Sequence, residues 1–306
     1  MGQYALRRLV LLVPQAWLTV SLLFLLFRLV PGDPAALIAG PGGTQAQIDR
    51  LRAELGLDAP LWAQYGAFLR DLLRGDLGPS LSFGRPVATV IATRLGPTLA
   101  LMSASLGLTV AVALPAGLVA AVRPLGALSQ SVMAATILLL SIPNFLVGLL
   151  LMDLFVVRLG WLPAAGTGGL AFLVMPSVAV AARLVALVSR TARASVVESL
   201  SEDYMRTARA KGLGAVPLVL RHALRPALVP IVTMLGLQAG YLLGGSVVIE
   251  TLFAYQGLGQ AMISAVSMRD YFLVQGIALV YVAGFLLLNL LVDLSYGLVD
   301  PRIRYR

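Results

Sequence analysis

The sequence of 306 residues contains no cysteine, a single lysine (Lys211) and a single histidine (His222). The lack of cysteine excludes disulfides, thiolate metal sites and cysteine nucleophiles. A Walker A nucleotide site needs Gly-Lys-Ser/Thr, but Lys211 is followed by glycine, so this chain is predicted not to bind ATP. One histidine also excludes an HExxH zinc site and leaves only His222 for a Ser/His/Asp triad. We therefore expect a chain that is not an enzyme and carries no cofactor or metal of its own.

Charge is scarce as well. Charged residues make up 12% of the chain and hydrophobic residues 59%, with a mean hydropathy of +0.90. Soluble domains carry about 25% charged residues, so this composition predicts a polytopic membrane protein. The net charge of +9 would suggest nucleic acid for a soluble protein. In a membrane protein it indicates the Lys/Arg bias of inner loops, and no nucleic-acid partner is expected.

Long apolar runs predict an all-α fold with six transmembrane helices. A bilayer core of roughly 30 Å needs about 20 apolar residues in a helix. Six runs qualify, at 9–30, 97–122, 132–157, 170–188, 227–249 and 272–298. The first run is longer than the apolar core of a signal peptide, about 7–15 residues, and ends in Arg28 and Pro31. We therefore predict that it is retained as the first span.

Basic residues fall mainly in alternate connections, which sets the topology. Seven of them lie between the fourth and fifth runs, and others precede the first run, separate the second from the third and follow the sixth. Both termini and the connection 193–226 are therefore expected to be cytoplasmic. The short connections on the other side hold only Arg158 and Arg269.

The long connection 31–96 is then predicted to form an extracytoplasmic helical cap between spans one and two. Thr44 and Gln47 fit a capping box, Gly56 is placed to end that helix, and Pro60 suits the start of another. The resulting division is 1–30 for the N-terminus and first span, 31–96 for the cap, 97–298 for the transmembrane core and 299–306 for a cytoplasmic tail.

A basic segment interrupts the apolar core at 203–230, "DYMRTARAKGLGAVPLVLRHALRPALVP". Ser201, Glu202 and Asp203 suit a helix start, and a helix to about Lys211 would end in a turn at Gly212. Composition alone favours an inner loop whose charges only determine topology. The small residues Ala208 and Gly212, however, also fit a contact surface for a partner protein. Small residues permit close approach and arginines supply charge-assisted bonds at the rim of such a contact.

Several motifs, in order along the chain, carry a family resemblance. They are "FRLVPGDPA" (27–35), "RGDLGPSLSFGRPV" (74–87), "IPNF" (142–145), the basic segment, "VVIETLFAYQGLG" (247–259), "MRDYFLVQG" (268–276) and "NLLVDLSYGLVDPRIR" (289–304). This set resembles the dipeptide/oligopeptide/nickel branch of the binding-protein-dependent ABC import permeases, over essentially the whole chain. In such permeases the basic segment is a coupling helix that sits in a groove of the ATPase subunit.

The resemblance implies a permease subunit of an ATP-driven importer in the bacterial inner membrane, in contact with lipid. Its implied partners are a homologous second permease, two cytoplasmic ATPases that bind ATP and Mg, and an extracytoplasmic solute-binding protein. The implied cargo is a di- or oligopeptide, with nickel or a metal chelate as the alternative, and glutathione or opines also open. The implied ATPase-coupling residues are Asp203, Tyr204, Arg206, Thr207, Ala208, Arg209, Lys211 and Gly212. Of the motif's "EAA" letters, only the one at Ala208 is kept.

Polar groups inside spans are the candidates for the transport pathway: Arg183, Asn144, Asp153 and Glu250. Arg183 is expected near mid-membrane, either paired with Asp153, snorkelling to an interface, or lining a cavity where it meets an anionic cargo. Asn144 follows Pro143, where packing at a kink is favoured over cargo contact. An ion-coupled secondary transporter that uses Asp153 or Asp293, and a purely structural scaffold, are the other classes left open.

Overall fold

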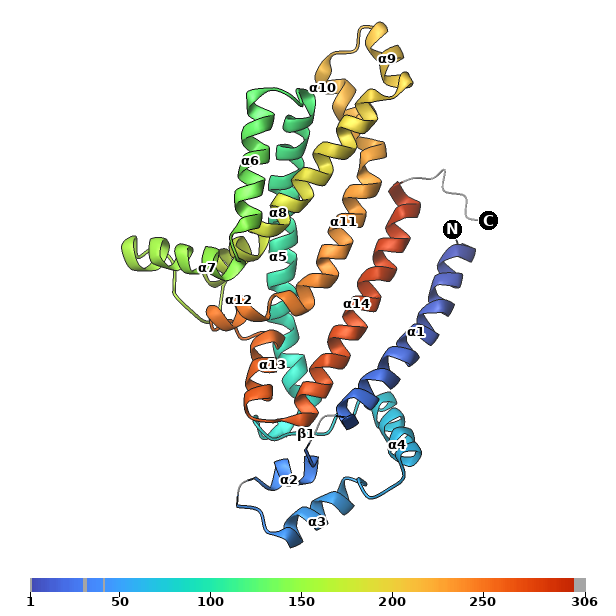
Figure 1. Ribbon diagram of the computed structural model, residues 1–306, viewed down its shortest axis with the longest axis vertical. Coiled ribbons are helices and arrows are strands. Elements are labelled where there is room, and N and C mark those ends of the chain that lie inside the picture. The colour runs from blue at the N-terminus through green and yellow to red at the C-terminus, as the bar shows by residue number, and fades with distance from the viewer. Residues whose placement is uncertain (1, 30–31, 41, 300–306) are drawn as a thin grey trace.

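The computed structural model describes residues 2–29, 32–40 and 42–299, and the expected tail beyond Val299 lies outside this range. Long helices run side by side, with small helices at the two ends of the molecule (Figure 1). Five helices are long and apolar enough to cross a membrane, and a sharply bent pair brings the number to six. The five are α1 (Gly2–Leu29), α5 (Val87–Val122), α8 (Leu170–Ser201), α11 (Leu224–Gly245) and α14 (Tyr271–Val299). The predicted helical membrane fold is confirmed.

The third span departs from prediction. Instead of one helix over 132–157, the chain forms α6 (Ala127–Ser141) and α7 (Asn144–Met152), which continues as a π-helical segment (Asp153–Arg158). The two parts are bent by 95°, and α7 points sideways from the bundle (Figure 1). Pro143 causes the break, because proline cannot donate to the preceding turn and drives the residue before it out of the helical region. That residue, Ile142, is extended.

Other bounds differ as well. α8 starts at Leu170 as expected but continues to Ser201, past the expected end at 188. α5 begins at Val87 and takes in Pro97, where the second span was expected to start. The fifth span ends at Gly245, before the expected 249, and the chain then forms the unpredicted helices α12 (Val247–Leu252) and α13 (Leu258–Ser267). α13 is apolar but too short to cross a membrane.

Close contacts between small residues bring the central helices together. A Cβ added to Gly117 of α5 would lie 2.6 Å from the Ala192 Cβ of α8, and one added to Gly236 of α11 would lie 2.0 Å from Val292 of α14. Small residues at these points let helix backbones approach closely, as is usual within membranes. By contrast, α1 packs mainly along α14 and leaves most of its apolar surface exposed.

The cap, residues 34–86, contains α2 (Pro34–Ala39), α3 (Gln45–Glu54), α4 (Leu61–Leu73) and a hairpin of β1 (Pro79–Ser80) and β2 (Arg85–Pro86). The predicted capping box is confirmed, because Thr44 and Gln47 exchange both hydrogen bonds. Gly56 follows α3 at φ +63° and Pro60 precedes α4, also as predicted. The hairpin is a small departure from an all-α fold.

Asp270 joins this hairpin to α14. The carboxylate is fully buried. Its Oδ2 accepts hydrogen bonds from the Ser80 hydroxyl (2.6 Å), the Ser82 hydroxyl (2.6 Å) and the Ser82 N–H (2.9 Å), while Oδ1 accepts from the Leu273 N–H (3.2 Å). Burial acts to raise the pKa of Asp270, but these bonds outweigh it and hold the pKa below its usual value. The sequence showed Asp270 only within a family motif. An acid directly before a long apolar helix was the available signal.

An Asp270→Asn variant should loosen the hairpin. The amide keeps one acceptor oxygen, so in either orientation its nitrogen faces at least one of the four donors and cannot accept from it, at a local cost of roughly 1–3 kcal/mol. We expect faster hydrogen exchange across residues 79–86, and no such change in Asp76→Asn, whose carboxylate accepts a single backbone bond from Gly78. Because the folded pKa is lowered, the stabilisation is complete above the unfolded pKa of about 4 and is lost only as pH falls through the folded pKa. Wild-type protection at pH 5 should therefore equal that at pH 7.

Candidate functional site

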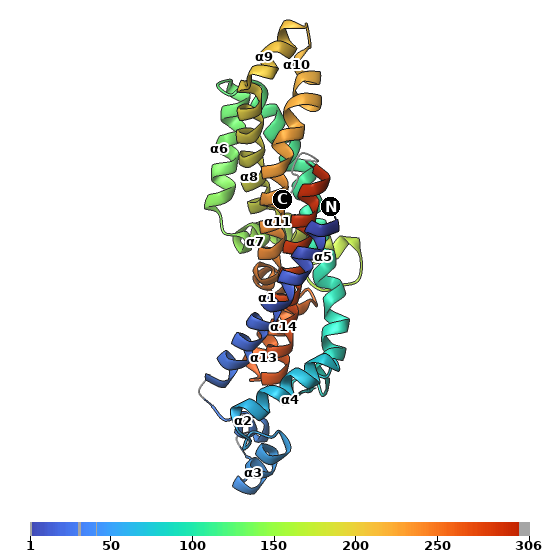
Figure 2. The ribbon, with the colours of Figure 1, turned by 90° about the vertical axis from the view of Figure 1, so that its right-hand side faces the viewer.

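The basic segment forms the end of the molecule opposite the cap (Figures 1 and 2). It contains α9 (Asp203–Ala210), α10 (Ala215–Pro217) and a π-helical segment (Leu218–Ala223) that runs into α11. The helix predicted from 203 to about 211 is confirmed, and a second short helix follows it at Ala215. The helix starts as expected after Ser201, but Ser201 does not cap it: Glu202 is the N-cap without a side-chain bond, and the Ser201 hydroxyl donates to the Glu198 carbonyl.

Gly212 ends α9 in a Schellman turn. Its φ is +81°, and its N–H donates to the Arg209 carbonyl at 2.9 Å. The next N–H, of Leu213, donates to the Ala208 carbonyl at 3.3 Å. This pair of bonds is the usual way for a helix to end at a glycine in the left-handed region. The turn predicted at Gly212 is therefore present, and its geometry favours glycine over any other residue.

One face of α9 is buried against the chain itself. Met205 is fully buried and Ala208 nearly so, in a cluster with Val196 of α8 and with Leu218 and Val219 of the π-helical segment. Ala208 was predicted to allow a partner protein to approach. The structure contradicts that role, because the side chain packs inward, three residues after Met205 on the same helical face. These two residues attach α9 to the ends of α8 and α11.

The opposite face of α9 is exposed. Arg206 forms an ion pair with Asp203 at 3.4 Å, and both side chains lie largely in solvent, where such a pair contributes little and is free to exchange partners. The Arg209 guanidinium reaches the Leu200 carbonyl at 3.4 Å. Leu213 and Val216, which follow α9 in the chain, also expose their apolar side chains. The exposed members of the predicted coupling set are Asp203, Tyr204, Arg206, Thr207, Arg209, Lys211 and Gly212.

Arg183 lies near the middle of α8 and is exposed. Its predicted partner Asp153 instead bonds Arg158 at 2.8 Å, and within the described ranges Arg183 forms no ion pair. Arg190, two turns further along α8, is exposed on the same side. An unpaired arginine in the middle of a membrane helix is unfavourable against lipid. Among the described residues, this side of α8 thus presents two exposed cations without a counter-charge from the chain itself.

Glu250 was predicted as a pathway residue, but it has no exposed surface. Its Oε1 accepts from the hydroxyls of Thr98 (2.9 Å) and Ser246 (3.0 Å), and its Oε2 accepts from the N–H groups of Gly259 (2.7 Å) and Gln260 (3.2 Å). A Cβ at Gly259 would lie 2.9 Å from Oε2. The carboxylate thus joins α5, α12 and α13 inside the protein, and it does not face open space.

The remaining candidate acids are also paired. Asp293 of α14 meets Arg8 of α1 at 2.9 Å, and Asp153 meets Arg158 as described. Asn144 begins α7 directly after the Pro143 break and is half-buried. In the part of the chain that the structure describes, no three His, Asp or Glu side chains gather as metal ligands would.

Family models match both parts of the chain. Residues 113–305 match the model described as binding-protein-dependent transport system inner membrane component, and residues 1–102 match the model for the N-terminal part of such membrane components. The chain belongs to this family. The permease is 43% identical over 309 residues to the glutathione transport system permease protein GsiC of Escherichia coli K12, and 44% identical over 306 residues to that of Pectobacterium atrosepticum. All chains are covered completely in both comparisons.

A solved structure shares the permease fold. It is the inward-facing MetNI methionine ABC transporter, with a TM-score of 0.56 at 21% identity. The match covers 69% of the permease and 96% of that chain. With the family established, the permease is a multi-pass protein of the inner membrane and a subunit of an ABC importer, whose ATP is used by partner subunits. The scaffold and ion-coupled classes are set aside, and Asp153 and Asp293 both have arginine partners.

Proposed function

We propose that the permease forms half of the pathway by which an ABC importer moves a short peptide, with glutathione as the first cargo to test. The observation that supports this class is the identity of 43% over the full length to permeases named for glutathione transport. Glutathione is itself a peptide, which agrees with the peptide branch expected from the sequence motifs. A nickel or metal-chelate cargo uses the same architecture and is an alternative outcome of the cargo test.

We infer the orientation of the permease in the membrane from the unequal distribution of arginines between the connections on its two sides. α9 and both termini lie on the cytoplasmic side, and the cap lies outside, where a solute-binding protein docks. The assembly further contains a second, homologous permease and two ATPase subunits. The exposed face of α9, from Asp203 to Gly212, is the surface offered to one ATPase.

The contacts of Met205 and Ala208 suggest how a movement of α9 reaches the membrane-spanning helices. When ATP closes the ATPase subunits, α9 moves with them. Met205 and Ala208 transmit that displacement to α8 and α11, because packed side chains move as a rigid unit rather than deforming. The cavity between the permeases then opens outward, and hydrolysis of ATP returns it to the inward-facing state.

The cargo test combines two measurements. Ligands of the cognate solute-binding protein are identified, and uptake is followed in vesicles that carry the assembled importer. We expect ATP-dependent uptake of glutathione or of short peptides. Uptake of a nickel chelate alone would identify the chelate as the cargo. Uptake that persists after ATP depletion would contradict the assignment to an ATP-driven importer.

Arg183 is proposed as a cation of the pathway, because it is exposed in the middle of α8. Arg183→Gln should lower the uptake of peptides that carry a net negative charge about tenfold, since a charge-assisted contact is lost. Basal ATP hydrolysis should be unchanged. Arg123→Gln removes the same charge from an exposed position after α5 and should leave uptake intact. Wild-type KM and rate for every peptide in Arg183→Gln would remove Arg183 from the pathway.

A further inference from the structure

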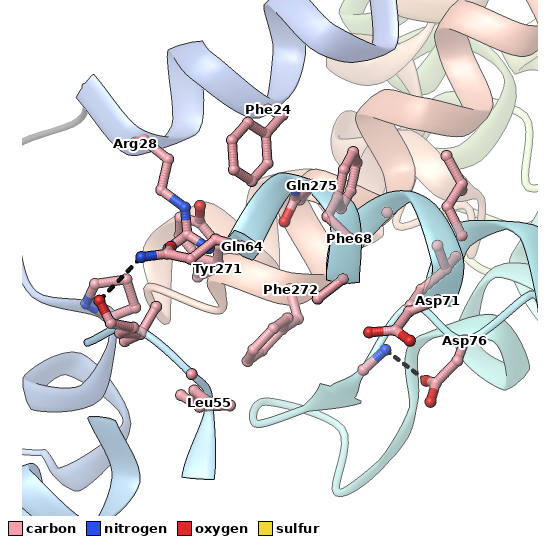
Figure 3. A pocket seen from close by; sticks show the side chains of 18 of the residues that line it. Phe24, Arg28, Leu55, Gln64, Phe68, Asp71, Asp76, Tyr271, Phe272 and Gln275 are labelled. Atoms are coloured by element: carbon pink, nitrogen blue, oxygen red, sulfur yellow. Dashed lines mark hydrogen bonds between the residues drawn. The ribbon is translucent and has the colours of Figure 1, made fainter. Parts of the chain in front are cut away.

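A cavity of about 350 Å³ lies between α1, α4 and the first turns of α14, on the cap side of the molecule (Figure 3). Phe24, Phe68 and Phe272 contribute aromatic walls, while Arg28 and Gln64 supply polar groups. Its volume is within the range of small-molecule sites, about 300–1,000 Å³. Among the described residues, none from α5, α8 or α11 lines it. The cavity is therefore separate from the packed centre of the bundle.

Two buried polar atoms beside the cavity have no partner. They are Nε of Arg28 and Oε1 of Gln64, each without a hydrogen bond to any described residue. The Gln64 amide nitrogen donates to the carbonyls of Leu57 (2.9 Å) and Ala59 (2.8 Å), which orients the side chain and leaves Oε1 as a free acceptor. The Arg28 guanidinium lies 5.3 Å from the centre of the Phe24 ring. Buried polar groups normally have partners, so these two indicate a ligand that both accepts and donates.

The cavity lies at one end of α1, a helix that is long and apolar enough to cross a membrane. Arg28 is in the last turn of α1, and the adjacent Leu25, Leu26 and Leu29 expose their side chains. On α4, Trp62 is 78% exposed. An arginine at the end of an apolar helix and an exposed tryptophan are both typical of the headgroup level of a bilayer. Acyl chains of a lipid bound here would continue along the exposed leucines of α1.

The charges of the residues that line the cavity determine which lipid headgroup would fit there. Arg28 is the one cation among the described lining residues, whereas Glu54, Asp71 and Asp76 are acids. Glu54 and Asp71 have arginine neighbours outside the cavity, whereas the Asp76 carboxylate accepts from the Gly78 N–H and from no other group that the structure describes. An anionic headgroup would be repelled by these carboxylates. A headgroup that offers a phosphate to Arg28 and an ammonium to the acids and to Gln64 would match the charges of both signs in the lining.

We propose that this cavity binds the headgroup of an ethanolamine phospholipid from the leaflet on the cap side. A short peptide is also zwitterionic and could satisfy the same polar groups. The lipid is favoured because the cavity adjoins the exposed leucines of α1 and is not bordered by α5, α8 or α11, the helices of the packed centre. Displacement by peptide is therefore an outcome that the test must distinguish.

The assembled importer would be reconstituted in bilayers of mixed phosphatidylethanolamine and phosphatidylglycerol, and the co-purifying lipid identified by native mass spectrometry. We expect selective retention of phosphatidylethanolamine. Arg28→Gln should lower that retention about tenfold, because a charge-assisted bond is lost. Arg74→Gln removes the same charge from an exposed position of the cap and should retain lipid normally. Equal retention of both lipids, or no effect of Arg28→Gln, would overturn the proposal.

A second measurement needs no variant. A phosphatidylethanolamine analogue with a photoreactive headgroup, added to the wild-type complex, should label peptides that contain Arg28, Gln64 or Tyr271. Labelling confined to other segments, or its loss on addition of a dipeptide, would contradict a lipid site. Neither measurement uses transport, so either result leaves the proposed function to its own test.

Discussion

A Gly212→Val importer should still hydrolyse ATP but move less than about a tenth as much cargo per ATP as wild type. Gly212 ends α9 at φ +81°, in the left-handed region that a β-branched residue adopts only with strain of about 1–3 kcal/mol. Relief of that strain would break the Schellman bonds from Gly212 and Leu213 to the end of α9. The exposed face of α9 would then no longer be held in a fixed direction relative to α8.

The measurement is paired uptake and ATP hydrolysis by the reconstituted importer. Gly214→Val is the matched control, because Gly214 lies outside the positive-φ region and a Cβ there has its nearest neighbour at 3.9 Å. The control should remain coupled. If both variants transport at the wild-type ratio of cargo to ATP, the turn at Gly212 has no part in coupling.

Glu250→Ala should give the largest loss of stability. Four donors from Thr98, Ser246, Gly259 and Gln260 would lose their acceptor in a fully buried site. Unsatisfied buried donors cost about 1–3 kcal/mol each, so even partial relaxation leaves roughly 3 kcal/mol or more. We expect the thermal midpoint of the purified permease to fall by roughly 5 °C or more.

Two comparisons make this result specific. Glu250→Gln keeps one acceptor oxygen and should lie between wild type and Glu250→Ala. Glu198→Ala removes an exposed acid of α8 and should not shift the midpoint. An unchanged midpoint for Glu250→Ala would show that the network does not hold α5, α12 and α13 together.

Local features of the sequence predicted local features of the fold. Apolar runs identified the spans, and Thr44 with Gln47 identified a helix start, because both signals lie within a few turns of the chain. The break in the third span also had a local cause in Pro143, which a count of apolar residues does not detect. The short helices α12 and α13 were missed because neither has the length of a span.

The site was predicted in outline but not in detail. Gly212 and the exposed arginines of α9 were identified. The burial of Ala208 was not, because it depends on Leu218 and Val219 packing against α9, and the sequence pattern does not predict that contact. The partners of Glu250 and Asp270 include Thr98 and Ser80, 152 and 190 residues away in sequence. Such pairs depend on the tertiary arrangement, and no spacing rule for a single helix gives them.

The length of α5 has a geometric consequence. A helix of 36 residues is about 54 Å long, against a hydrocarbon layer of roughly 30 Å. It starts directly after the hairpin of the cap and packs along α8, which leads to α9. Such a helix works as a lever: tilting it by about 5° around one end moves the other end by roughly 5 Å. In the orientation proposed above, a small tilt about the α9 end of this helix would therefore displace its cap end, on the opposite face of the membrane, by a larger distance.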